Sequence, residues 1–473
     1  MTNSNKNKIK VIKSIDELFK LVDIKENTNI SFHHHLRNGD GVINYVLDKY
    51  LREGVGNLNL FPSAIFPGYM KILELIEHGL VNNITTNYLN GPVAEYISEH
   101  GLPGMLTMQT HGGRARAIIE GINKIDITFI AVPYATIYGD AVGYLGENKC
   151  GSLGYIIPDS KHAKLKILVT DNLVNENIEN PEISGENIDY ILEVDSIGEK
   201  KGIVSGTTQI TTNPIGVKIA KNTSRLLFEL GLIKPGFSFQ SGAGGVSLRA
   251  TKDLKDIMIR ENIKASFFSG GITKYHVEML ESGLVEKLYD VQCFDLEAVD
   301  SISRNENHIP ISASTYANPN NPKQVIKDLD IVILGATEID YNFNVNVTTD
   351  SHQTIIGGSG GHSDTASEAK VSVIVSPLIK GRIPVIRERV TTITTLGKNI
   401  DCLVTERGIA INPLRKDLIE KLKDSKLKIY TIEELANIAH KYTKIPKSVI
   451  NCDKIIGEVV DRTFEVIDNL YQK

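Results

Sequence analysis

The second half of this chain repeats the first half, and no other feature restricts its possible folds as strongly. The pattern EHGLV at 77–81 returns as ESGLV at 281–285, and in both copies an aspartate that opens an apolar run lies 47 residues beyond the shared glycine. Further along, CGSLGY at 150–155 matches GGSGGH at 357–362, and both copies contain NID, at 187–189 and at 399–401. A register that holds over several motifs predicts two copies of one folding unit.

Within each copy, short apolar runs alternate with helical stretches. The stretches at 68–78 and 277–282 are predicted helices, and apolar runs follow Lys164 and Lys370. This alternation is typical of βα units and parallel sheets. We therefore predict an α/β fold of two similar, doubly wound, mainly parallel domains. Because ligands bind at the carboxyl ends of strands in such sheets, the active site is expected between the domains.

The boundary between the two copies is marked by TTNPIGV at 211–217. Its proline and glycine interrupt a polar stretch before a predicted helix at 218–230. With 473 residues, the chain also exceeds the usual size of a single core. The first domain is therefore predicted at 1–215 and the second at 216–473.

Composition excludes several classes of function. The net charge is −5 without any block of like charges, which gives no footprint for nucleic acid or for an anionic membrane. The sequence has no apolar run of 18 residues and no hydrophobic leader, so a cytoplasmic location is predicted. Four widely spaced cysteines form no CxxC pair, which argues against a zinc knuckle or a disulfide framework.

Three glycine-rich turns are candidate ligand-binding loops. SGAGGVS at 241–247 precedes a helical stretch, so the backbone N–H groups of Gly242, Gly244 and Gly245 could face a phosphate or an oxyanion. It does not match the Walker or dinucleotide motifs, and structural packing is an equal alternative. HGGRAR at 111–116 offers His111 and Arg114, and arginines bind carboxylates bidentately. The third turn is the dense cluster Gly357, Gly358, Ser359, Gly360, Gly361 and His362.

The stretch SFHHHLRNGD at 31–40 contains three consecutive histidines. On a strand, side chains alternate, so His33 and His35 should share one face and His34 the other. One metal ion cannot easily bind all three, and no cysteine or carboxylate ligand is adjacent, so no metal site is predicted. Histidines with Arg37 at a strand end favour binding of a small polycarboxylate; core or capping histidines are the alternative.

Together, these motifs identify the chain as similar to a known family. THGGRARAI at 110–118, SFQSGAGG at 238–245, SASTYANP at 312–319, GGSGGHSDTA at 357–366 and GRIPVI at 381–386 occur in an order that resembles the citrate lyase alpha subunit family, from Ile9 to the C-terminus. The resemblance implies a CoA-transferase fold. It also implies a thioester exchange, in which citrate replaces acetate on a CoA-type thioester.

The resemblance further implies partners and residue roles. Partners would be a beta subunit and a gamma subunit, the acyl carrier, whose CoA-like prosthetic group carries the thioester; no cofactor is expected to be tightly bound to this chain, and a homo-oligomer is expected. Citrate would be bound by His33, His35, Arg37, His111 and Arg114. The prosthetic group would lie against Gly357, Gly358, Ser359, Gly360, Gly361 and His362.

The mechanism implied by the resemblance depends on one departure from related enzymes. Many CoA-transferases carry CoA on a glutamate, and matching that segment to ASFFSGG at 265–271 places Ser266 at the glutamate position. A serine cannot form the carboxyl-derived thioester, so direct attack by the substrate carboxylate through a mixed anhydride is expected. Glu338 is the next candidate for a nucleophile or base. Gly242, Gly244 and Gly245 are the expected oxyanion donors.

Three alternative functions remain open at this stage. The first is a stand-alone CoA-transferase or acyl-CoA hydrolase for an acid such as acetate or citramalate. The second is a sugar-phosphate isomerase or deaminase, because a fold does not fix a function. The third is a subunit that only assembles the complex. The sequence leaves citrate and citramalate undistinguished, and it leaves the oligomeric state and the carrier-docking surface open.

Overall fold

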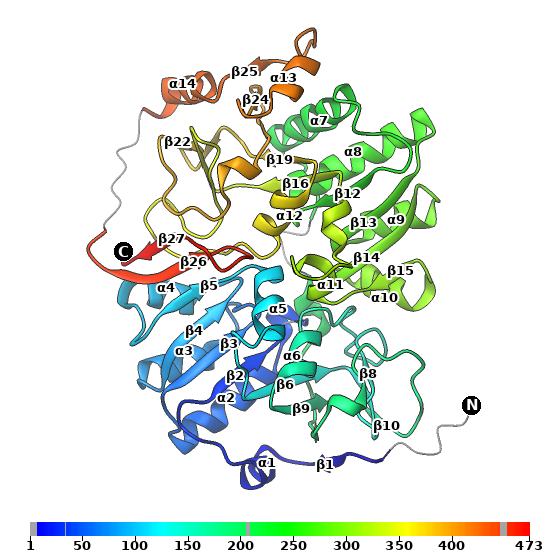
Figure 1. Cartoon of the computed structure of the whole chain (residues 1–473), viewed down its shortest axis with the longest axis vertical. Coiled ribbons are helices and arrows are strands. Elements are labelled where there is room, and N and C mark those ends of the chain that lie inside the picture. The colour runs from blue at the N-terminus through cyan, green and yellow to red at the C-terminus, as the bar shows by residue number, and fades with distance from the viewer. Residues whose placement is uncertain (1–6, 34, 205–208, 445–451) are drawn as a thin grey trace.

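Two large sheets, one in each half of the chain, organise the molecule (Figure 1). The computed structural model describes residues 7–33, 35–204, 209–444 and 452–473. The first sheet runs in the order β1 (Lys10–Ile12), β11 (Tyr190–Glu193), β9 (Leu165–Thr170), β6 (Ile127–Val132), β2 (Asn29–Phe32), β3 (Leu58–Pro62), β4 (Val81–Thr86), β5 (Leu106–Met108), β26 (Ile455–Val460) and β27 (Val466–Tyr471). The second runs in the order β15 (His308–Pro310), β14 (Val285–Cys293), β13 (Ala265–Ile272), β12 (Ser238–Ser241), β16 (Ile331–Gly335), β19 (Val371–Val375), β23 (Cys402–Val404), β24 (Ile409–Ile411) and β25 (Ile429–Tyr430).

The sequence repeat corresponds to a repeated topology. The run β11-β9-β6-β2-β3-β4-β5 has the same order as β23-β19-β16-β12-β13-β14-β15, and every pairing within both runs is parallel. The predicted mainly parallel α/β fold is therefore confirmed. All six residues of β6 and all five of β19 are buried, as expected for central parallel strands covered on both faces.

Smaller sheets follow the same duplication. β7 (Tyr134–Thr136) pairs with β8 (Ala141–Val142) and β10 (Leu173–Val174), and β17 (Glu338–Asp340) pairs with β18 (Val345–Asn346) and β22 (Ile386–Arg387) in the same senses. The second half also has a short hairpin of β20 (Ile379–Lys380) and β21 (Ile383–Pro384).

Helices connect the strands and cover the sheets (Figure 1). The predicted helices at 68–78, 218–230 and 277–282 correspond to α3 (Met70–Glu77), α7 (Pro214–Glu229) and α9 (Lys274–Glu281), respectively. The helices of the first half are α1 (Ile15–Leu21), α2 (Val42–Glu53), α3 (Met70–Glu77), α4 (Pro92–His100), α5 (His111–Ile119) and α6 (Ile157–His162). Those of the second half are α7 (Pro214–Glu229), α8 (Gly245–Glu261), α9 (Lys274–Glu281), α10 (Leu296–Arg304), α11 (Ala313–Ala317), α12 (His362–Glu368), α13 (Lys416–Lys421) and α14 (Ile432–Thr443).

The C-terminal hairpin corrects the predicted extent of the second domain. β26 pairs with β5 of the first sheet, with Gly457 opposite Leu106 and Val459 opposite Met108. Residues 455–471 therefore lie in the first sheet (Figure 1) and not in the second domain as 216–473 implied. The hairpin covers the otherwise open edge of β5. The hairpin has no counterpart in the first half of the chain, so the repeat could not predict it. The domain boundary at residue 215 stays a prediction.

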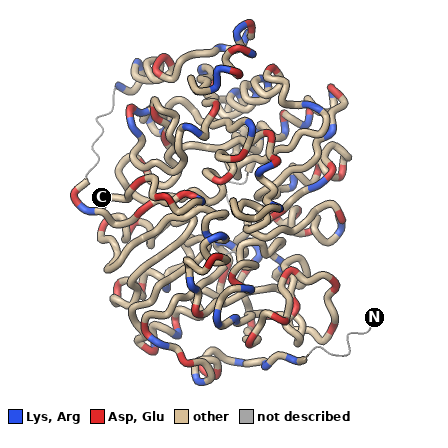
Figure 2. Tube along the Cα trace, in the orientation of Figure 1, with Lys and Arg blue, Asp and Glu red and all other residues tan. Residues whose placement is uncertain are grey.

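Charge and cysteine placement agree with the composition. Figure 2 shows both signs of charge interspersed along the chain, without a region of one sign. Cys150, Cys293 and Cys402 are buried and Cys452 is exposed, and none of these four described residues is in a disulfide. Among the described residues, the helices are too short or too polar to cross a membrane.

Candidate active site

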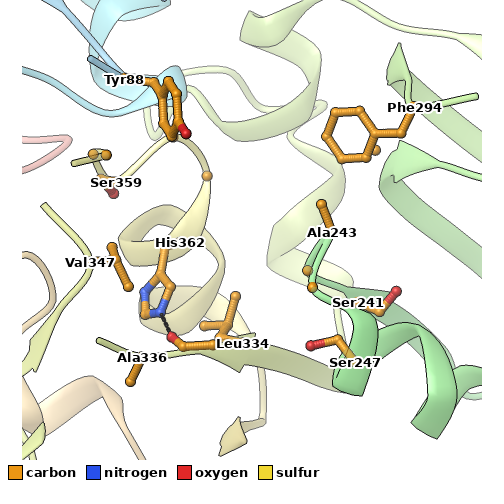
Figure 3. Close-up of a pocket in the computed structure, with 18 of the residues that line it drawn as sticks. Tyr88, Ser241, Ala243, Ser247, Phe294, Leu334, Ala336, Val347, Ser359 and His362 are labelled. Atoms are coloured by element: carbon orange, nitrogen blue, oxygen red, sulfur yellow. Dashed lines mark hydrogen bonds between the residues drawn. The ribbon is translucent and has the colours of Figure 1, made fainter. Parts of the chain in front are cut away.

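A pocket of about 680 Å³ lies between the two halves, at the carboxyl ends of the strands. Loops that follow strands of both sheets line the pocket. Its position agrees with the predicted active site between the two domains. Its lining from the first half includes Arg37, Phe66, Tyr88, His111 and Tyr155. Its lining from the second half includes Gln240, Ser247, Phe294, Tyr316, His362 and Lys380. Figure 3 shows several of these side chains around the pocket.

The charge of this lining is entirely positive. Among the described residues that line the pocket, none is Asp or Glu, and the two with a formal charge are Arg37 and Lys380. The remaining polar groups are hydroxyls, amides, histidines and backbone groups. A pocket of this kind favours anions, and none of the described lining residues brings a carboxylate to act as a nucleophile.

Arg37 is the residue best placed to bind a carboxylate. Its guanidinium lies 5.4 Å from the ring centroid of Phe66 and 5.0 Å from that of Phe294, and it donates to the carbonyl of Ile203 at 3.3 Å. Burial lowers the pKa of the guanidinium. No carboxylate pairs with it among the described residues. Its remaining N–H groups are therefore available to a ligand carboxylate, and citrate binding by Arg37 stays a prediction.

His33 and His35 do not line the pocket. This placement corrects the prediction that they bind citrate directly. Their Nδ1 atoms are 2.6 Å apart and their ring centroids 4.6 Å apart. Both residues lie beyond β2, which ends at Phe32, so the predicted alternation along a strand does not account for this contact. Both residues are buried, and burial lowers the pKa of His33 to about 3. The alternative of core histidines is the one that the structure supports; His34 lies outside the described residues.

The prediction that Arg114 binds citrate is also corrected, because its guanidinium is already paired with a carboxylate. Both of its terminal nitrogens donate to the Asp159 carboxylate, at 2.9 and 2.7 Å, and it donates further to the carbonyl of Phe61 at 2.9 Å. Arg114 and Asp159 are 3% and 0% exposed. This buried bidentate pair is structural, and Arg114 does not line the pocket.

His111 does line the pocket, in a fixed orientation. It begins α5, where Thr110 caps the helix by accepting from the Gly113 amide at 2.9 Å. The Asn87 side-chain amide donates to Nδ1 at 2.9 Å, so the proton of the neutral ring is on Nε2. Burial, together with the charge of Arg114, lowers the pKa of His111 to about 3. His111 is therefore a neutral donor to a ligand.

The turn at 241–247 meets the oxyanion expectation only in part. The Gly242 amide donates to the Ile333 carbonyl at 2.8 Å, so it is not available to a ligand. Gly245 is outside the lining. Gly244, Val246 and Ser247 line the pocket at the first turn of α8, where helix N–H groups lack intrahelical partners. Of the three predicted donors, Gly244 alone remains available, and Val246 and Ser247 are available in addition to it.

The loop 357–362 lines the pocket at all six predicted positions. Its backbone contacts the first half directly, because the His111 amide donates to the Gly360 carbonyl at 2.9 Å and the Gly360 amide donates to the Asn87 carbonyl at 3.1 Å. His362 donates from Nε2 to the Gly335 carbonyl at 2.9 Å (Figure 3), and Thr395 donates to its Nδ1 at 2.8 Å. The ring of His362 is therefore held on the pocket wall.

Ser266 and Glu338 are not in the pocket, and both predictions of a direct catalytic role are corrected. Ser266 lies at the amino end of β13 and donates to the Phe237 carbonyl at 3.2 Å, about 16 Å along the strand from the lining residue Gly271. Glu338 is 1% exposed. Its carboxylate accepts from Ser351 at 2.6 Å, from the Thr391 amide at 2.8 Å and from Asn346 at 3.0 Å.

Sequence reasoning did not identify the aromatic and amide groups of the pocket. Tyr88, Tyr155, Tyr316 and Phe294 line it, and Gln240 donates to the Tyr316 hydroxyl at 2.7 Å. Tyr88 and Phe294 lie within two residues of the ends of β4 and β14, which is a signal that could have indicated them, whereas Tyr316 lies in the short helix α11. Outside the pocket, Asp290, Cys293 and His308 form a buried hydrogen-bonded group with ligand-type atoms within 4.8 Å. The prediction of no metal site stays untested.

Comparison with known proteins gives a consistent result over the full length. A family model described as "Citrate lyase, alpha subunit" matches residues 8–473. The citrate lyase alpha chain of Haemophilus influenzae is 42% identical over 98% of this chain and 93% of its own, and that of Escherichia coli is 39% identical over 98% and 91%. The alpha subunit of citrate lyase from Streptococcus mutans, solved in complex with citrate, superposes with a TM-score of 0.95 at 42% identity and covers 100% of this chain and 92% of that one.

More distant structures share the fold alone. The malonate decarboxylase alpha subunit of Acinetobacter baumannii superposes with a TM-score of 0.68 at 14% identity, covering 92% of both chains. The duplicated α/β body therefore does not by itself indicate a substrate, and the residues of the pocket must carry the argument about chemistry.

Proposed function

The chain belongs to the citrate lyase alpha subunit family, and from this membership we propose that it exchanges acetyl for citrate on a CoA-type thioester. It is a transferase component of a citrate lyase complex, with citrate as the acid substrate. The other product would be acetate, and the citryl thioester would pass to the subunit that cleaves it.

The lack of carboxylates among the described lining residues is the observation that carries the mechanism. If the enzyme offers no nucleophilic carboxylate, the attacking oxygen must come from citrate. A citrate carboxylate attacks the acetyl carbonyl, the C–S bond breaks, and a mixed anhydride and a thiolate form. The thiolate then attacks the citryl carbonyl, the bond between the citryl carbonyl carbon and the bridging oxygen breaks, and the citryl thioester forms. Acetate leaves with one oxygen that came from citrate.

The residues of the pocket divide between two tasks. Arg37 and the Nε2–H of His111 would bind citrate carboxylates. The first-turn amides of α8, at Gly244, Val246 and Ser247, would stabilise the oxyanion formed on the thioester carbonyl. Removal of one such donor typically costs about 10²–10³-fold in rate. The loop 357–362 would contact the arm that carries the thioester.

Several finer points belong to this proposal. The partners would be a beta subunit and a gamma acyl carrier subunit with a CoA-like prosthetic group. A homo-oligomer, a cytoplasmic location and the lack of a cofactor resident on this chain stay predictions.

A single assay tests the proposed reaction. The protein is incubated with acetyl-CoA and citrate, citramalate or ¹³C-labelled acetate, and acyl-CoA products are identified by mass spectrometry. Citryl-CoA as the favoured product supports the proposal. Preference for citramalate or acetate would indicate a different CoA-transferase, net loss of thioester would indicate a hydrolase, and no turnover would indicate an assembly role.

Oxygen labelling tests the direct route. Enzyme in excess over acetyl-CoA is mixed with citrate labelled with ¹⁸O in its carboxylates, and the acetate released in the first turnover is analysed. Direct attack puts one ¹⁸O into that acetate. A covalent enzyme carboxylate would supply its own unlabelled oxygen, so unlabelled acetate would exclude direct attack.

A further inference from the structure

Lys380 is the second cation of the pocket, and the proposed exchange of acetyl for citrate gives it no role. It ends β20, lines the pocket and is exposed to solvent. No hydrogen bond or ion pair occupies its amino group among the described residues. The neighbouring carboxylate of Glu406 accepts from the Leu378 amide at 3.0 Å and faces Arg407 at 3.8 Å.

The hairpin that carries Lys380 is well defined. Lys380 pairs with Ile383 across β20 and β21, and the Val385 amide donates to the Leu378 carbonyl at 3.0 Å. The two turn residues, Gly381 and Arg382, have φ angles of 56° and 67°, as a two-residue type I′ turn requires. Arg382 at the tip is also exposed. A short, regular hairpin thus holds Lys380 in the pocket lining, with Arg382 two residues away at its tip.

The two pocket cations differ in a way that separates their ligands. Arg37 comes from the first half, is half-buried and contacts the rings of Phe66 and Phe294. Lys380 comes from the second half and remains in contact with solvent. In a chain with a net charge of −5, an unpaired cation at a pocket rim attracts anions locally.

We infer that Lys380, assisted by Arg382, binds phosphate groups of the thioester carrier at the pocket rim, while Arg37 binds the carboxylic acid inside. This inference rests on the proposed function. A CoA-type thioester has its reactive carbonyl at one end of a long, uncharged pantetheine arm and its phosphates at the other end. When the thioester lies near α8, the phosphates must lie well away from it, and a lysine is a suitable point charge for them.

Thioesters with and without phosphate test the inference. The protein and its Lys380→Ala and Lys380→Ala/Arg382→Ala variants are assayed with acetyl-CoA, acetyl-phosphopantetheine, acetyl-pantetheine and the acetylated carrier subunit. With acetyl-CoA, kcat/KM should fall about 10-fold in the single variant, through KM, and further in the double variant. With acetyl-pantetheine, which has no phosphate, the same variants should change it less than about two-fold.

Controls separate charge from structure. Lys380→Arg should restore most of the affinity for acetyl-CoA, and Lys398→Ala, which removes an exposed lysine outside the pocket lining, should have no effect. Loss with acetyl-phosphopantetheine and the carrier would assign the phosphate next to pantetheine, whereas loss with acetyl-CoA alone would assign the phosphates of its nucleotide part.

The inference can fail independently of the proposed function. Equal losses with acetyl-CoA and acetyl-pantetheine, or no loss with either, would overturn it while turnover of citrate by the unaltered protein continued. Binding of free CoA and of pantetheine is measured by calorimetry in parallel. If the protein does not catalyse the exchange, a CoA affinity that does not respond to Lys380→Ala would still overturn the inference.

Discussion

The guanidinium of Arg37 lies 5.0 Å from the ring centroid of Phe294, although the two residues come from opposite halves of the duplicated chain. Phe66 of the first half lies 5.4 Å away, so two aromatic rings from different halves of the chain contact one cation. Cation–π contacts of this kind hold the side chain without consuming its N–H donors. Arg37 is thereby positioned by the closure of the two halves while its donors remain available to an anion.

Removal of Arg37 should therefore affect citrate more than the thioester. In Arg37→Ala, we expect kcat/KM for citrate to fall about 100-fold, because one charge-assisted bidentate contact is lost. Arg37→Lys should recover only part of it, because lysine lacks the planar fork. Steady-state assays of citryl-CoA formation at varied citrate measure this. Arg225→Ala, on the exposed side of α7, is the control, and an unchanged KM for citrate in Arg37→Ala would contradict the assignment.

We expect Glu338 to stabilise the fold and not to take part in catalysis. In Glu338→Gln, we expect kcat to stay within about three-fold, while the free energy of unfolding falls by about 1–3 kcal/mol because buried hydrogen bonds to Ser351, Asn346 and the Thr391 amide are weakened. Urea denaturation and the citryl-CoA assay measure the two effects. Acetyl-CoA followed by borohydride should leave both proteins active. Inactivation of the unaltered protein alone would identify Glu338 as a covalent nucleophile.

The pairing of Arg114 with Asp159 predicts a loss of stability rather than a loss of citrate binding. Arg114→Met leaves the Asp159 carboxylate buried without its partner, which should cost about 3–5 kcal/mol of unfolding free energy. In the double variant Arg114→Met/Asp159→Leu, much of that cost should disappear because no unpaired charge remains. Chemical denaturation of the three variants measures this. A raised KM for citrate at full stability would instead return Arg114 to the binding site.

Arg37, Arg114 and Glu338 show which features of the site the sequence can predict and which it cannot. The repeat and the alternation of apolar runs predict the fold because they are local patterns with a fixed period, and strand ends predict where Arg37 lies. Arg37 and Arg114 look equally suitable in the sequence, but only the structure reveals that Asp159 neutralises Arg114. The burial of Glu338 by Ser351 and Thr391 is equally invisible, because those partners are far apart in the chain. The pairing of β26 with β5 lies outside the repeat altogether.

Because the pKa of His111 is lowered, we expect that titration of this residue does not change kcat/KM between pH 5 and 8. Burial and Arg114 place the pKa at about 3, so the ring is neutral throughout pH 5–8 and donates from Nε2. We expect His111→Gln, which retains an N–H donor, to have a lower kcat/KM but the same profile shape in that range. A limb near pH 6–7 that is present in the unaltered protein and absent in His111→Gln would contradict a neutral donor.

The same shift has a consequence for stability. Because the folded pKa of His111 is lower than the ordinary value of 6.5, the unfolded chain binds the proton more readily, so the contribution to stability is lost as the pH falls from about 6.5 toward 3. Between pH 4 and 6, the unfolding free energy of His111→Gln should therefore fall less steeply than that of the unaltered protein. Urea denaturation at several pH values measures the slope, and equal slopes would show that His111 is already charged in the fold.

The contact of Gly358 with Asn87 joins the two halves at the pocket and should not tolerate a larger residue. A Cβ atom at Gly358 would lie 2.4 Å from the Asn87 carbonyl oxygen and 2.7 Å from the Met108 methyl group. Because a carbonyl cannot move aside cheaply, Gly358→Ala should displace the loop that bonds to His111 through Gly360, at a cost of about 1–3 kcal/mol. We expect a clear loss of kcat together with that loss of stability. Gly335→Ala, whose Cβ would meet nothing within 4 Å, should leave the unfolding free energy unchanged. If Gly358→Ala kept full activity and stability, the close approach of the two halves would not be needed to form the pocket.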